Sequence, residues 1–232
     1  FRLIRANLNF IIPNLDKLGK TILVTSTTSG EGKSFVSINT AAALALSGNK
    51  VLLMGMDFRA PKINEYLNLP DKKGITNYIS DSKLIFDELK FKIPNIDSLD
   101  IISSGVIPPN PSELVTKDRV EALFLEVKQK YDFIVVDTAP VNLVSDTLLI
   151  AKYADMFMYI VRANYSDKRS LVVPQELYKE NKLPNVAIIL NDIDSRRDGY
   201  GYEGYSYGGY GYGGYGYGAT EVKKPWYRRI FS

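Results

Sequence analysis

The sequence predicts an α/β fold, a parallel β-sheet with helices on both faces, from three observations. Short apolar runs that end in turn residues recur along the chain, helix-like stretches lie between them, and the runs are continuous in Val, Ile and Leu rather than alternating with polar residues. Continuous runs are typical of strands buried on both faces, and strands that alternate with helices pair in parallel through right-handed crossovers. The expected strands span 21–26, 51–54, 99–103, 133–136, 156–161 and 187–190, and the expected helices span 34–47, 111–130, 145–153 and 168–181.

Length and composition indicate one folded domain followed by a tail. With 232 residues, 45% of them hydrophobic, the chain can bury one substantial core, which we place in residues 1–198. From Gly199 to Gly218 the sequence is almost only Gly and Tyr, with eight of the sixteen tyrosines and ten of the seventeen glycines. Such a segment has high backbone entropy and lacks aliphatic core residues, so we expect 199–232 to be a disordered tail.

Composition also excludes several classes of function. Cys is absent, which removes disulfides, zinc-thiolate sites and cysteine nucleophiles together. The net charge of +3 is small and the Lys and Arg residues are scattered, so we expect no nucleic-acid partner. The longest apolar runs are far shorter than the roughly 20 residues that a spanning helix needs. Because the first residue is Phe1 rather than Met, we expect an excised piece of a longer chain, whose upstream portion could carry a membrane segment.

A phosphate-binding loop is predicted at 27–34, where TTSGEGKS follows a strand and opens a helix. Glycines let backbone N–H groups surround a phosphate, and the helix N-terminus adds its own free donors. Lys33 is expected to reach the β- and γ-phosphates of ATP, and the Ser34 hydroxyl to bind Mg²⁺. Thr27 stands where the general pattern has Gly, and the alternative is an incidental glycine-rich turn before a helix. The expected nucleotide contacts are Ser29, Gly30, Glu31, Gly32, Lys33, Ser34 and Phe35.

Two carboxylates at expected strand ends are candidates for the metal. Asp137 follows four apolar residues, which is the Walker B arrangement for holding Mg²⁺ or its water shell, and Asp57 follows the run at 51–54. Ligands in such folds bind at the carboxyl ends of the strands, so both acids are expected near the loop. For each, the alternative is a helix cap or a turn residue.

Five motifs occur in order along the chain: GEGKS at 30–34, VLLMGMDFRAPK at 51–62, GVIPPNPSEL at 105–114, DFIVVDTAP at 132–140 and the tyrosine cluster. Taken together, they resemble the bacterial tyrosine kinases, the BY-kinases, over nearly the whole chain. The resemblance implies a P-loop NTPase-like fold, Mg·ATP, tyrosine autophosphorylation and an octamer-like homo-oligomeric ring. It also implies a cytoplasmic domain at the bacterial inner membrane that serves capsular or exopolysaccharide synthesis, with a membrane-embedded activator, or a fused transmembrane portion, and a tyrosine phosphatase as partners.

The resemblance assigns further roles at both ends of the chain. Residues 1–12 read as an amphipathic oligomerisation helix, in which Arg2, Arg5 and Asn7 resemble the end of an ExxRxxR-type motif. The alternative is an ordinary solvated helix face. For the tail, the alternative is a sticky aromatic low-complexity segment, and length alone leaves phosphorylation in cis or in trans open. The expected phosphorylation sites are Tyr200, Tyr202, Tyr205, Tyr207, Tyr210, Tyr212, Tyr215 and Tyr217.

Two departures from related motifs affect the choice of function. MinD/ParA-type ATPases carry a signature Lys where this chain has Thr28, which disfavours a positioning or partitioning ATPase switch. The kinase family usually has Asp-x-Asp in its second acidic motif, whereas Gly55 takes the first position here. We therefore expect reduced or rearranged catalysis in which Asp57 and Asp137 share the metal, with a catalytically weakened nucleotide-binding regulator as the alternative.

Three further predictions concern the surroundings of the nucleotide. Arg59 is a candidate catalytic residue that would neutralise phosphate charge, and so would Arg162, unless each pairs with a nearby acid. The loop at Asn191 and Asp192, just beyond the last expected strand, is a candidate for contact with the adenine base.

Overall fold

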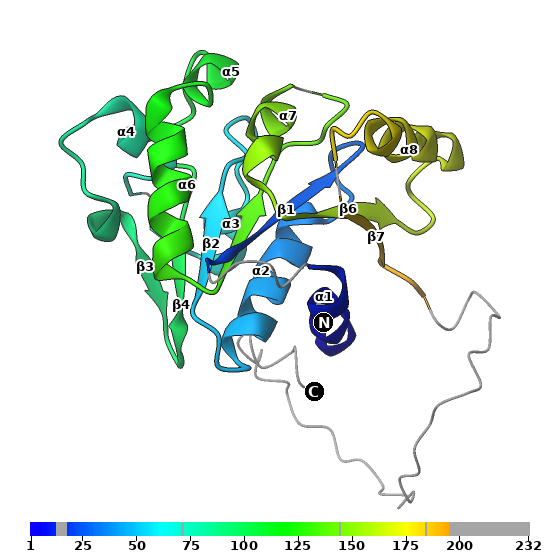
Figure 1. Cartoon of the computed structure of the whole chain (residues 1–232), viewed down its shortest axis with the longest axis horizontal. Helices are drawn as coiled ribbons and strands as arrows, with labels where there is room; N and C mark the ends of the chain where they lie inside the picture. Colours follow the sequence, from blue (N-terminus) through cyan, green and yellow to red (C-terminus); the bar gives the residue numbers. More distant parts are fainter. Residues whose placement is uncertain (13–17, 71, 144, 184, 195–232) are drawn as a thin grey trace, which may run out of the picture.

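The computed structural model describes residues 1–12, 18–70, 72–143, 145–183 and 185–194 (Figure 1). The Gly/Tyr segment and its eight candidate phosphorylation sites lie outside the described residues. The described part forms one sheet in the order β3-β4-β2-β5-β1-β6-β7. Its strands are β1 (Lys20–Ser26), β2 (Val51–Gly55), β3 (Phe91–Ile93), β4 (Ile96–Ile102), β5 (Phe133–Asp137), β6 (Met156–Arg162) and β7 (Val186–Asn191).

The parallel sheet predicted from the sequence is confirmed for six strands, and β3 adds an antiparallel edge that the sequence analysis did not include. Phe91 of β3 lies opposite Ile101 of β4. The two strands are joined by Pro94 and Asn95, and Asn95 adopts a left-handed backbone with φ of 67°. Proline and asparagine in so short a connection favour a turn, which is the local signal for this hairpin.

Helices cover both faces of the sheet. Successive side chains of a strand point to opposite faces, so an apolar strand contributes to the core on each side. In β1, Ile22 and Val24 join a core with α1 and α2, whereas Leu23 joins the core beneath α6 (Figure 1). The helix expected at 111–130 is two helices. The helices are α1 (Arg2–Ile11), α2 (Lys33–Ala45), α3 (Ile63–Leu67), α4 (Ile75–Ser80), α5 (Pro111–Leu114), α6 (Asp118–Lys130), α7 (Asp146–Ile150) and α8 (Val172–Lys179), with 3₁₀ turns η1 (Phe86–Leu89), η2 (Ala151–Tyr153) and η3 (Lys168–Leu171).

The predicted helix at the N-terminus is present as α1 and packs on α2. Leu8 is buried in the core, and the Phe1 ring meets the Phe35 ring edge-on with centroids 5.9 Å apart. Arg2 and Asn7 are exposed, and Arg5 is half-buried. Their role in oligomerisation stays a prediction. None of the helices within the described ranges is long and apolar enough to cross a membrane.

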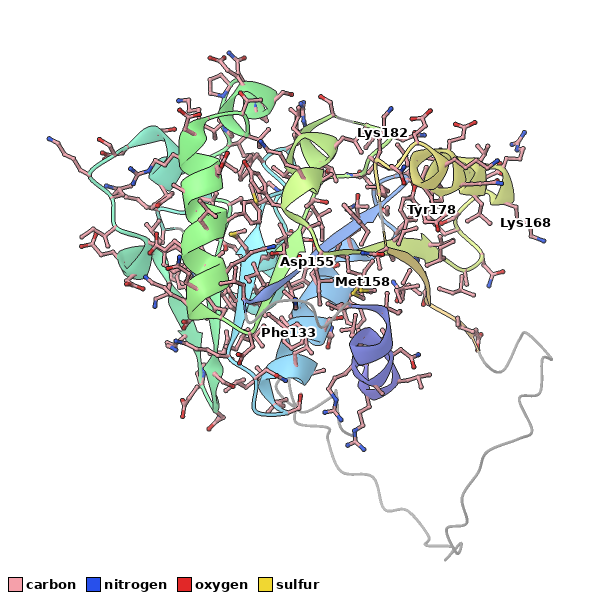
Figure 2. The ribbon with its side chains drawn as sticks, in the orientation of Figure 1. Phe133, Asp155, Met158, Lys168, Tyr178 and Lys182 are labelled. Atoms are coloured by element: carbon pink, nitrogen blue, oxygen red, sulfur yellow. The ribbon has the colours of Figure 1, made fainter. Side chains whose placement is uncertain are left out.

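A carboxylate forms hydrogen bonds at the amino ends of the central strands. Asp155, just before β6, accepts the Thr21 backbone N–H at 2.7 Å and the Lys128 ammonium at 2.9 Å. Figure 2 shows Asp155 and Met158 among the central strands, while Lys168, Tyr178 and Lys182 lie in the outer layer around α8. The opposite, carboxyl ends of β1, β2 and β5 remain for a ligand, as parallel sheets of this kind arrange them.

Candidate functional site

The phosphate-binding loop connects β1 to α2 and takes a conformation that depends on two glycines. Gly30 and Gly32 have φ of 81° and 92°, in the left-handed region that favours glycine. A Cβ on Gly32 would also lie 2.2 Å from the amide nitrogen of Asn191. Alternation of left- and right-handed residues lets successive backbone N–H groups converge on an anion, so these glycines build the cradle that the sequence predicts.

Two carbonyl groups of the loop accept hydrogen bonds from the end of β6 and from the segment that follows it. The Tyr165 hydroxyl donates to the Ser29 carbonyl at 3.1 Å, and Nη1 of Arg162 donates to the Gly30 carbonyl at 3.0 Å. In a trans peptide the C=O and the next N–H point in opposite directions. Holding these carbonyls against β6 therefore turns the N–H groups of the following residues away from β6.

Glu31 fixes the rest of the loop and is buried, with 1% of its surface exposed. Its carboxylate accepts the Thr28 backbone N–H at 2.8 Å and the Ser166 hydroxyl. Its carbonyl accepts Nδ2 of Asn191 at 3.0 Å. Because the Glu31 side chain is used inside the loop, this predicted nucleotide contact is limited to its backbone.

The first residue of the loop, Thr27, is hydrogen-bonded to the sheet. Its hydroxyl lies 2.8 Å from the phenol oxygen of Tyr159, a buried residue of β6. Burial raises the pKa of Tyr159 to about 12, so this phenol stays protonated and neutral near the site. A threonine in place of the usual glycine is thus accommodated by a hydrogen bond to the sheet.

Lys33 is the first residue of α2 and has only 7% of its surface exposed. Burial lowers the pKa of its ammonium group, although the charges of Asp137, Asp57 and Glu31 act in the opposite direction. A charge held away from water binds an incoming anion more strongly than a hydrated one, because the local dielectric is low. Lys33 is therefore suited to the phosphate contact predicted for it.

Asp137 ends β5 at the centre of the sheet, level with Val24 of β1 and Gly55 of β2. Its two carboxylate oxygens accept the hydroxyls of Ser34 at 2.7 Å and Ser37 at 3.1 Å. Burial raises the pKa of Asp137 to about 6, against the opposing hydrogen bond from Ser34 and the charge of Lys33. The serine hydroxyl and the carboxylate are the hard oxygen donors that Mg²⁺ prefers, so the residues fit this ion.

Asp57 combines the two roles that the sequence left open. It is 8% exposed, and one carboxylate oxygen accepts the backbone N–H groups of Arg59 at 3.1 Å and Ala60 at 3.0 Å, as a turn residue does. The same residue lines the pocket with Lys33 and Ser34. Asp57 can therefore shape the loop after β2 and still present an oxygen to a metal.

Gly55 stands where the kinase motif usually has its first acid, and the space around it is restricted. A Cβ there would lie 3.0 Å from the Ser104 backbone nitrogen and 3.3 Å from Cδ1 of Ile63. A larger side chain would require the β4–α5 connection to shift. The described arrangement thus leaves Asp57 and Asp137, the two acids predicted for the metal, as its candidate carboxylate ligands.

The two arginines of the sequence analysis are both paired with acids. Nε of Arg59 donates to Asp146 at 2.8 Å, and its Nη2 lies 3.3 Å from the hydroxyl of Ser112. Arg162 is paired with Asp192 at 3.0 Å. Arg162 lines the pocket, whereas Arg59 is directed to α7 and α5, and its catalytic role stays a prediction.

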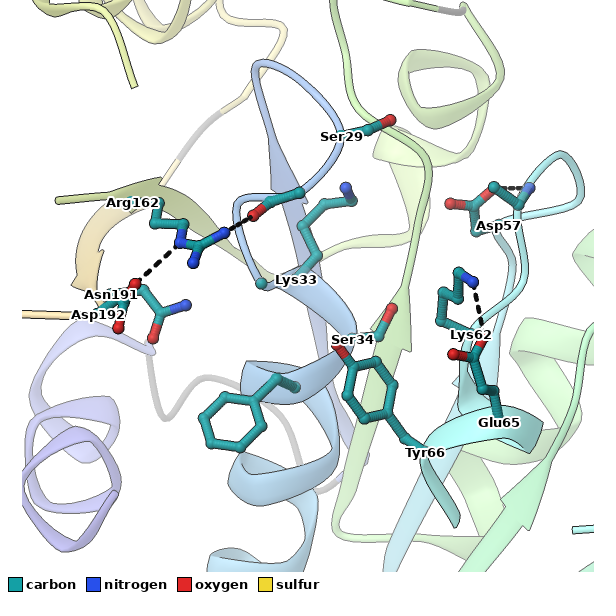
Figure 3. Close-up of a pocket in the computed structure, with 14 residues that line it drawn as sticks. Ser29, Lys33, Ser34, Asp57, Lys62, Glu65, Tyr66, Arg162, Asn191 and Asp192 are labelled. Atoms are coloured by element: carbon teal, nitrogen blue, oxygen red, sulfur yellow. Dashed lines mark hydrogen bonds and ion pairs between the residues drawn. The ribbon is translucent and has the colours of Figure 1, made fainter. Parts of the chain in front are cut away.

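A pocket of about 490 Å³ lies over the loop. Figure 3 shows Arg162, Asn191 and Asp192 on one side, Lys33 and Ser34 in the middle, and Asp57, Lys62 and Glu65 on the other. Every predicted nucleotide contact except Glu31 lines it, together with the candidate adenine loop. Lys62, just before α3, and Glu65 and Tyr66 within it were missed as pocket residues, because α3 is too short to give a periodic signal. The lining residues are Ser29, Gly30, Gly32, Lys33, Ser34, Phe35, Asp57, Ala60, Lys62, Glu65, Tyr66, Arg162, Asn191 and Asp192.

Comparison with known proteins identifies relatives of this chain. Residues 19–168 match the family model described as AAA domain. The chain is 30% identical over 203 residues to the tyrosine-protein kinase YwqD of Bacillus subtilis, covering 87% of this chain and 84% of the relative. It is also 30% identical to the tyrosine-protein kinase ptk of Acinetobacter johnsonii, over 73% of this chain but only 23% of that longer protein.

Solved structures show the same fold. The kinase domain of the Escherichia coli tyrosine kinase ETK superposes with a TM-score of 0.76 at 25% identity, covering 91% of this chain and 78% of that domain. The septum site-determining protein MinD of Pyrococcus horikoshii gives 0.61 at 18% identity, over 74% of this chain and 70% of that one. The latter likeness concerns the fold alone.

The burial of Asp137 predicts a pH-dependent effect on stability in the protein free of metal and nucleotide. With its pKa raised from the ordinary 3.8 to about 6, the folded state binds more protons than the unfolded state between these values. Stability from this group therefore falls as the pH rises through that range. We expect Asp137→Asn to raise the free energy of unfolding by about 1 to 3 kcal/mol at pH 7 and to give no such gain near pH 4.

Urea denaturation at both pH values measures this effect. Asp132→Asn, at an exposed carboxylate near the start of the same strand, is the control and should give little change between the two pH values. An equal effect of Asp137→Asn at pH 4 and pH 7 would contradict the assignment of the cost to the buried charge.

The hydrogen bond from Asn191 to the loop predicts a specific loss of nucleotide affinity. Asn191→Ala removes one donor to the Glu31 carbonyl, a change worth about 0.5 to 1.5 kcal/mol. We expect a roughly 3- to 10-fold weaker affinity for a non-hydrolysable ATP analogue, measured by calorimetry. Asn185→Ala is the matched control, because Asn185 donates to the Asp155 carbonyl at the other end of β7. Equal affinities for the two variants would refute the role of Asn191.

Proposed function

Because this chain belongs to the bacterial tyrosine kinases and is a protein-tyrosine kinase with a nucleotide-binding P-loop fold, we propose that it phosphorylates its own C-terminal tyrosines with Mg·ATP. The observation that carries this proposal is that Lys33, Ser34 and Asp57 line one pocket over the loop, while the buried Asp137 accepts the hydroxyl of Ser34 just beneath it. The same chain supplies eight tyrosines between 199 and 218 as acceptors.

The residues around the pocket have separable tasks in this reaction. The backbone N–H groups of the loop and Lys33 would bind the β- and γ-phosphates. Ser34, Asp137 and Asp57 would hold Mg²⁺, which neutralises phosphate charge when it is bound. A tyrosine oxygen forms a bond to the γ-phosphorus as the bond from that phosphorus to the bridging oxygen breaks. ADP leaves and the phenolic proton is released.

Positioning carries most of this reaction. A phenol with a pKa near 10 is a weak nucleophile at neutral pH, and phosphoryl transfer in most analyses has a loose transition state that needs little general base. A site with Gly55 in place of an acid can therefore still transfer phosphate if the tyrosine is held in line. Arg59, through Asp146 and Ser112, would support the turn that carries Asp57.

The proposal extends to the assembly in which the kinase works. Phosphorylation occurs in trans within a homo-oligomeric ring built with Arg2, Arg5 and Asn7 of α1. Each phosphotyrosine adds a charge of about −1.5 to −2. The accumulated negative charge weakens the association of subunits in the ring until a tyrosine phosphatase removes the phosphate groups. The ring acts on the cytoplasmic side of the bacterial inner membrane, with a membrane-embedded activator or fused transmembrane portion, and regulates capsular or exopolysaccharide synthesis. The greater length of ptk supports a fused portion in some relatives.

Gly55 favours one alternative, a nucleotide-binding regulator with weakened catalysis. The restricted space at Gly55 supports it, since the usual acid does not fit there without a shift. A MinD/ParA-like switch would instead release phosphate without modifying the chain. Both alternatives differ from the proposal in the fate of the γ-phosphoryl group.

Incubation with Mg·ATP and measurement of the intact mass tests the proposal. We expect a ladder of phosphate additions on the full chain, lost in Lys33→Met and when the eight tail tyrosines are replaced by phenylalanine. Lys73→Met, at an exposed lysine, is the matched control and should keep the ladder. Phosphate release without a ladder would support the switch, and binding without either would support the regulator.

A further inference from the structure

A second lysine lines the nucleotide pocket besides Lys33, and no step of the phosphate chemistry above uses it. Lys62 lies just before α3, and Figure 3 shows it on the side of Asp57, across the pocket from Arg162. It also borders the tightly packed region that Asp57 and Asp137 line. Lys62 therefore adjoins both the space for a nucleotide and the candidate metal carboxylates.

The backbone at Lys62 is held on both sides. Before it, the Asp57 carboxylate accepts two backbone N–H groups of the preceding turn, and Pro61 has a restricted φ. After it, the Lys62 carbonyl accepts the Tyr66 backbone N–H at 3.0 Å, which begins α3. The lysine side chain thus starts from a defined point on the pocket wall.

The ammonium group of Lys62 has a partner that it can exchange. It donates to the Glu65 carboxylate at 2.6 Å, and the two side chains are 52% and 71% exposed. This hydrogen bond raises the pKa of Lys62, so the group is positively charged at neutral pH. Exposed ion pairs contribute little to stability, because water and salt screen them. A triphosphate carries more charge than a carboxylate and can therefore draw the ammonium group away from Glu65.

The two arginines of the site are less free to move. Arg162 donates to a carbonyl of the phosphate loop at 3.0 Å, and Arg59 is paired with the buried Asp146. Displacing Arg162 would release the loop, and displacing Arg59 would leave a buried carboxylate without its cation. Among the described residues that line the pocket, Lys62 is the cation, besides Lys33, that can turn to a ligand without either loss.

Phosphoryl transfer benefits from a cation in this position. The charge of a loose transition state is spread over the oxygens of the transferred group, and fixed cations around that group stabilise it. Lys33 and the loop amides would hold the β- and γ-phosphates in the middle of the pocket, and Lys62 lies on the wall beside them. Gly55 borders the same packed region as Lys62 and adds no carboxylate there to compete for the ammonium group.

Resting on the proposed function, we propose that Lys62 is a catalytic residue that binds the γ-phosphate of ATP and stabilises the charge of the transferred phosphoryl group. Without nucleotide, Glu65 holds the ammonium group. With ATP bound, the ammonium group donates to the γ-phosphate oxygens instead. As the tyrosine oxygen bonds to the γ-phosphorus and the bond to the bridging oxygen breaks, Lys62 keeps its proton. Because ADP has no γ-phosphate, this residue should distinguish ATP from ADP.

Nucleotide affinity tests the contact apart from catalysis. With Mg²⁺ present, we expect Lys62→Met in the full chain to weaken binding of a non-hydrolysable ATP analogue about 10-fold by calorimetry and to leave ADP binding unchanged. Glu65→Gln should strengthen ATP-analogue binding about 2-fold, because the competing carboxylate is neutralised. Lys73→Met, at an exposed lysine outside the pocket, is the matched control for both ligands. An unchanged ATP-analogue affinity in Lys62→Met, or an equal loss for ADP, would overturn the contact.

The single-turnover rate of tail phosphorylation, followed by intact mass at saturating ATP, tests the catalytic role. Lys62→Met should slow it about 100-fold. Lys62→Arg keeps the positive charge and should retain more of the rate, whereas equal losses in the two variants would contradict a role for the charge. An unchanged rate in Lys62→Met would exclude a catalytic role. If the unsubstituted chain transfers no phosphate, the proposed function fails, and the contrast between ATP analogue and ADP still decides whether Lys62 contacts the γ-phosphate.

Discussion

The rest of the site depends on one constraint, the hydrogen bonds that attach the phosphate loop to β6, the segment after it and β7. A loop of small residues has many conformations, and only one of them presents its N–H groups to a common anion. Here the carbonyls of Ser29, Gly30 and Glu31 each accept a hydrogen bond, from the segment after β6, from the end of β6 and from the end of β7 respectively. The loop therefore loses its conformational entropy during folding rather than on nucleotide binding. A nucleotide binds to a loop that is already ordered.

The ordered loop serves both folding and ligand binding, whereas the central carboxylate lowers stability in order to serve the ligand. Asp137 is buried with its charge opposed by desolvation, and its two serine partners offset only part of that cost. A divalent cation would relieve the cost, because it stabilises the ionised form. Sites of this kind are commonly less stable than the rest of the fold, since the interactions that serve the ligand are incomplete without it.

Gly55 connects the family resemblance to what is particular to this chain. Read as a motif, it is a missing acid and suggests weakened catalysis. In three dimensions it lies at the junction of Asp57, Asp137 and Ser104, where a side chain would crowd the backbone of the next loop. The same residue thus removes a negative charge from the site and lets the Ser104 backbone approach closely beside the remaining carboxylates.

The sequence by itself determined the sheet, the loop and the carboxylates, because each has a local signal. Continuous apolar runs mark buried strands, GEGKS after such a run marks the loop, and the acid that follows the apolar run 133–136 marks Asp137. The position of Asn191 just after the expected strand 187–190 was also enough to place it at the pocket. These inferences depend only on neighbours in the chain and on the rule that parallel strands end at one edge.

Only the tertiary structure decided which side chains meet. Glu31 turns into the loop because Ser166, 135 residues away, donates to it, and Arg59 turns to Asp146, 87 residues away, rather than into the pocket. The short helix α3 and the antiparallel strand β3 have no periodic pattern long enough to read. Contacts between distant segments depend on packing of the whole chain, and no local window of sequence contains that information.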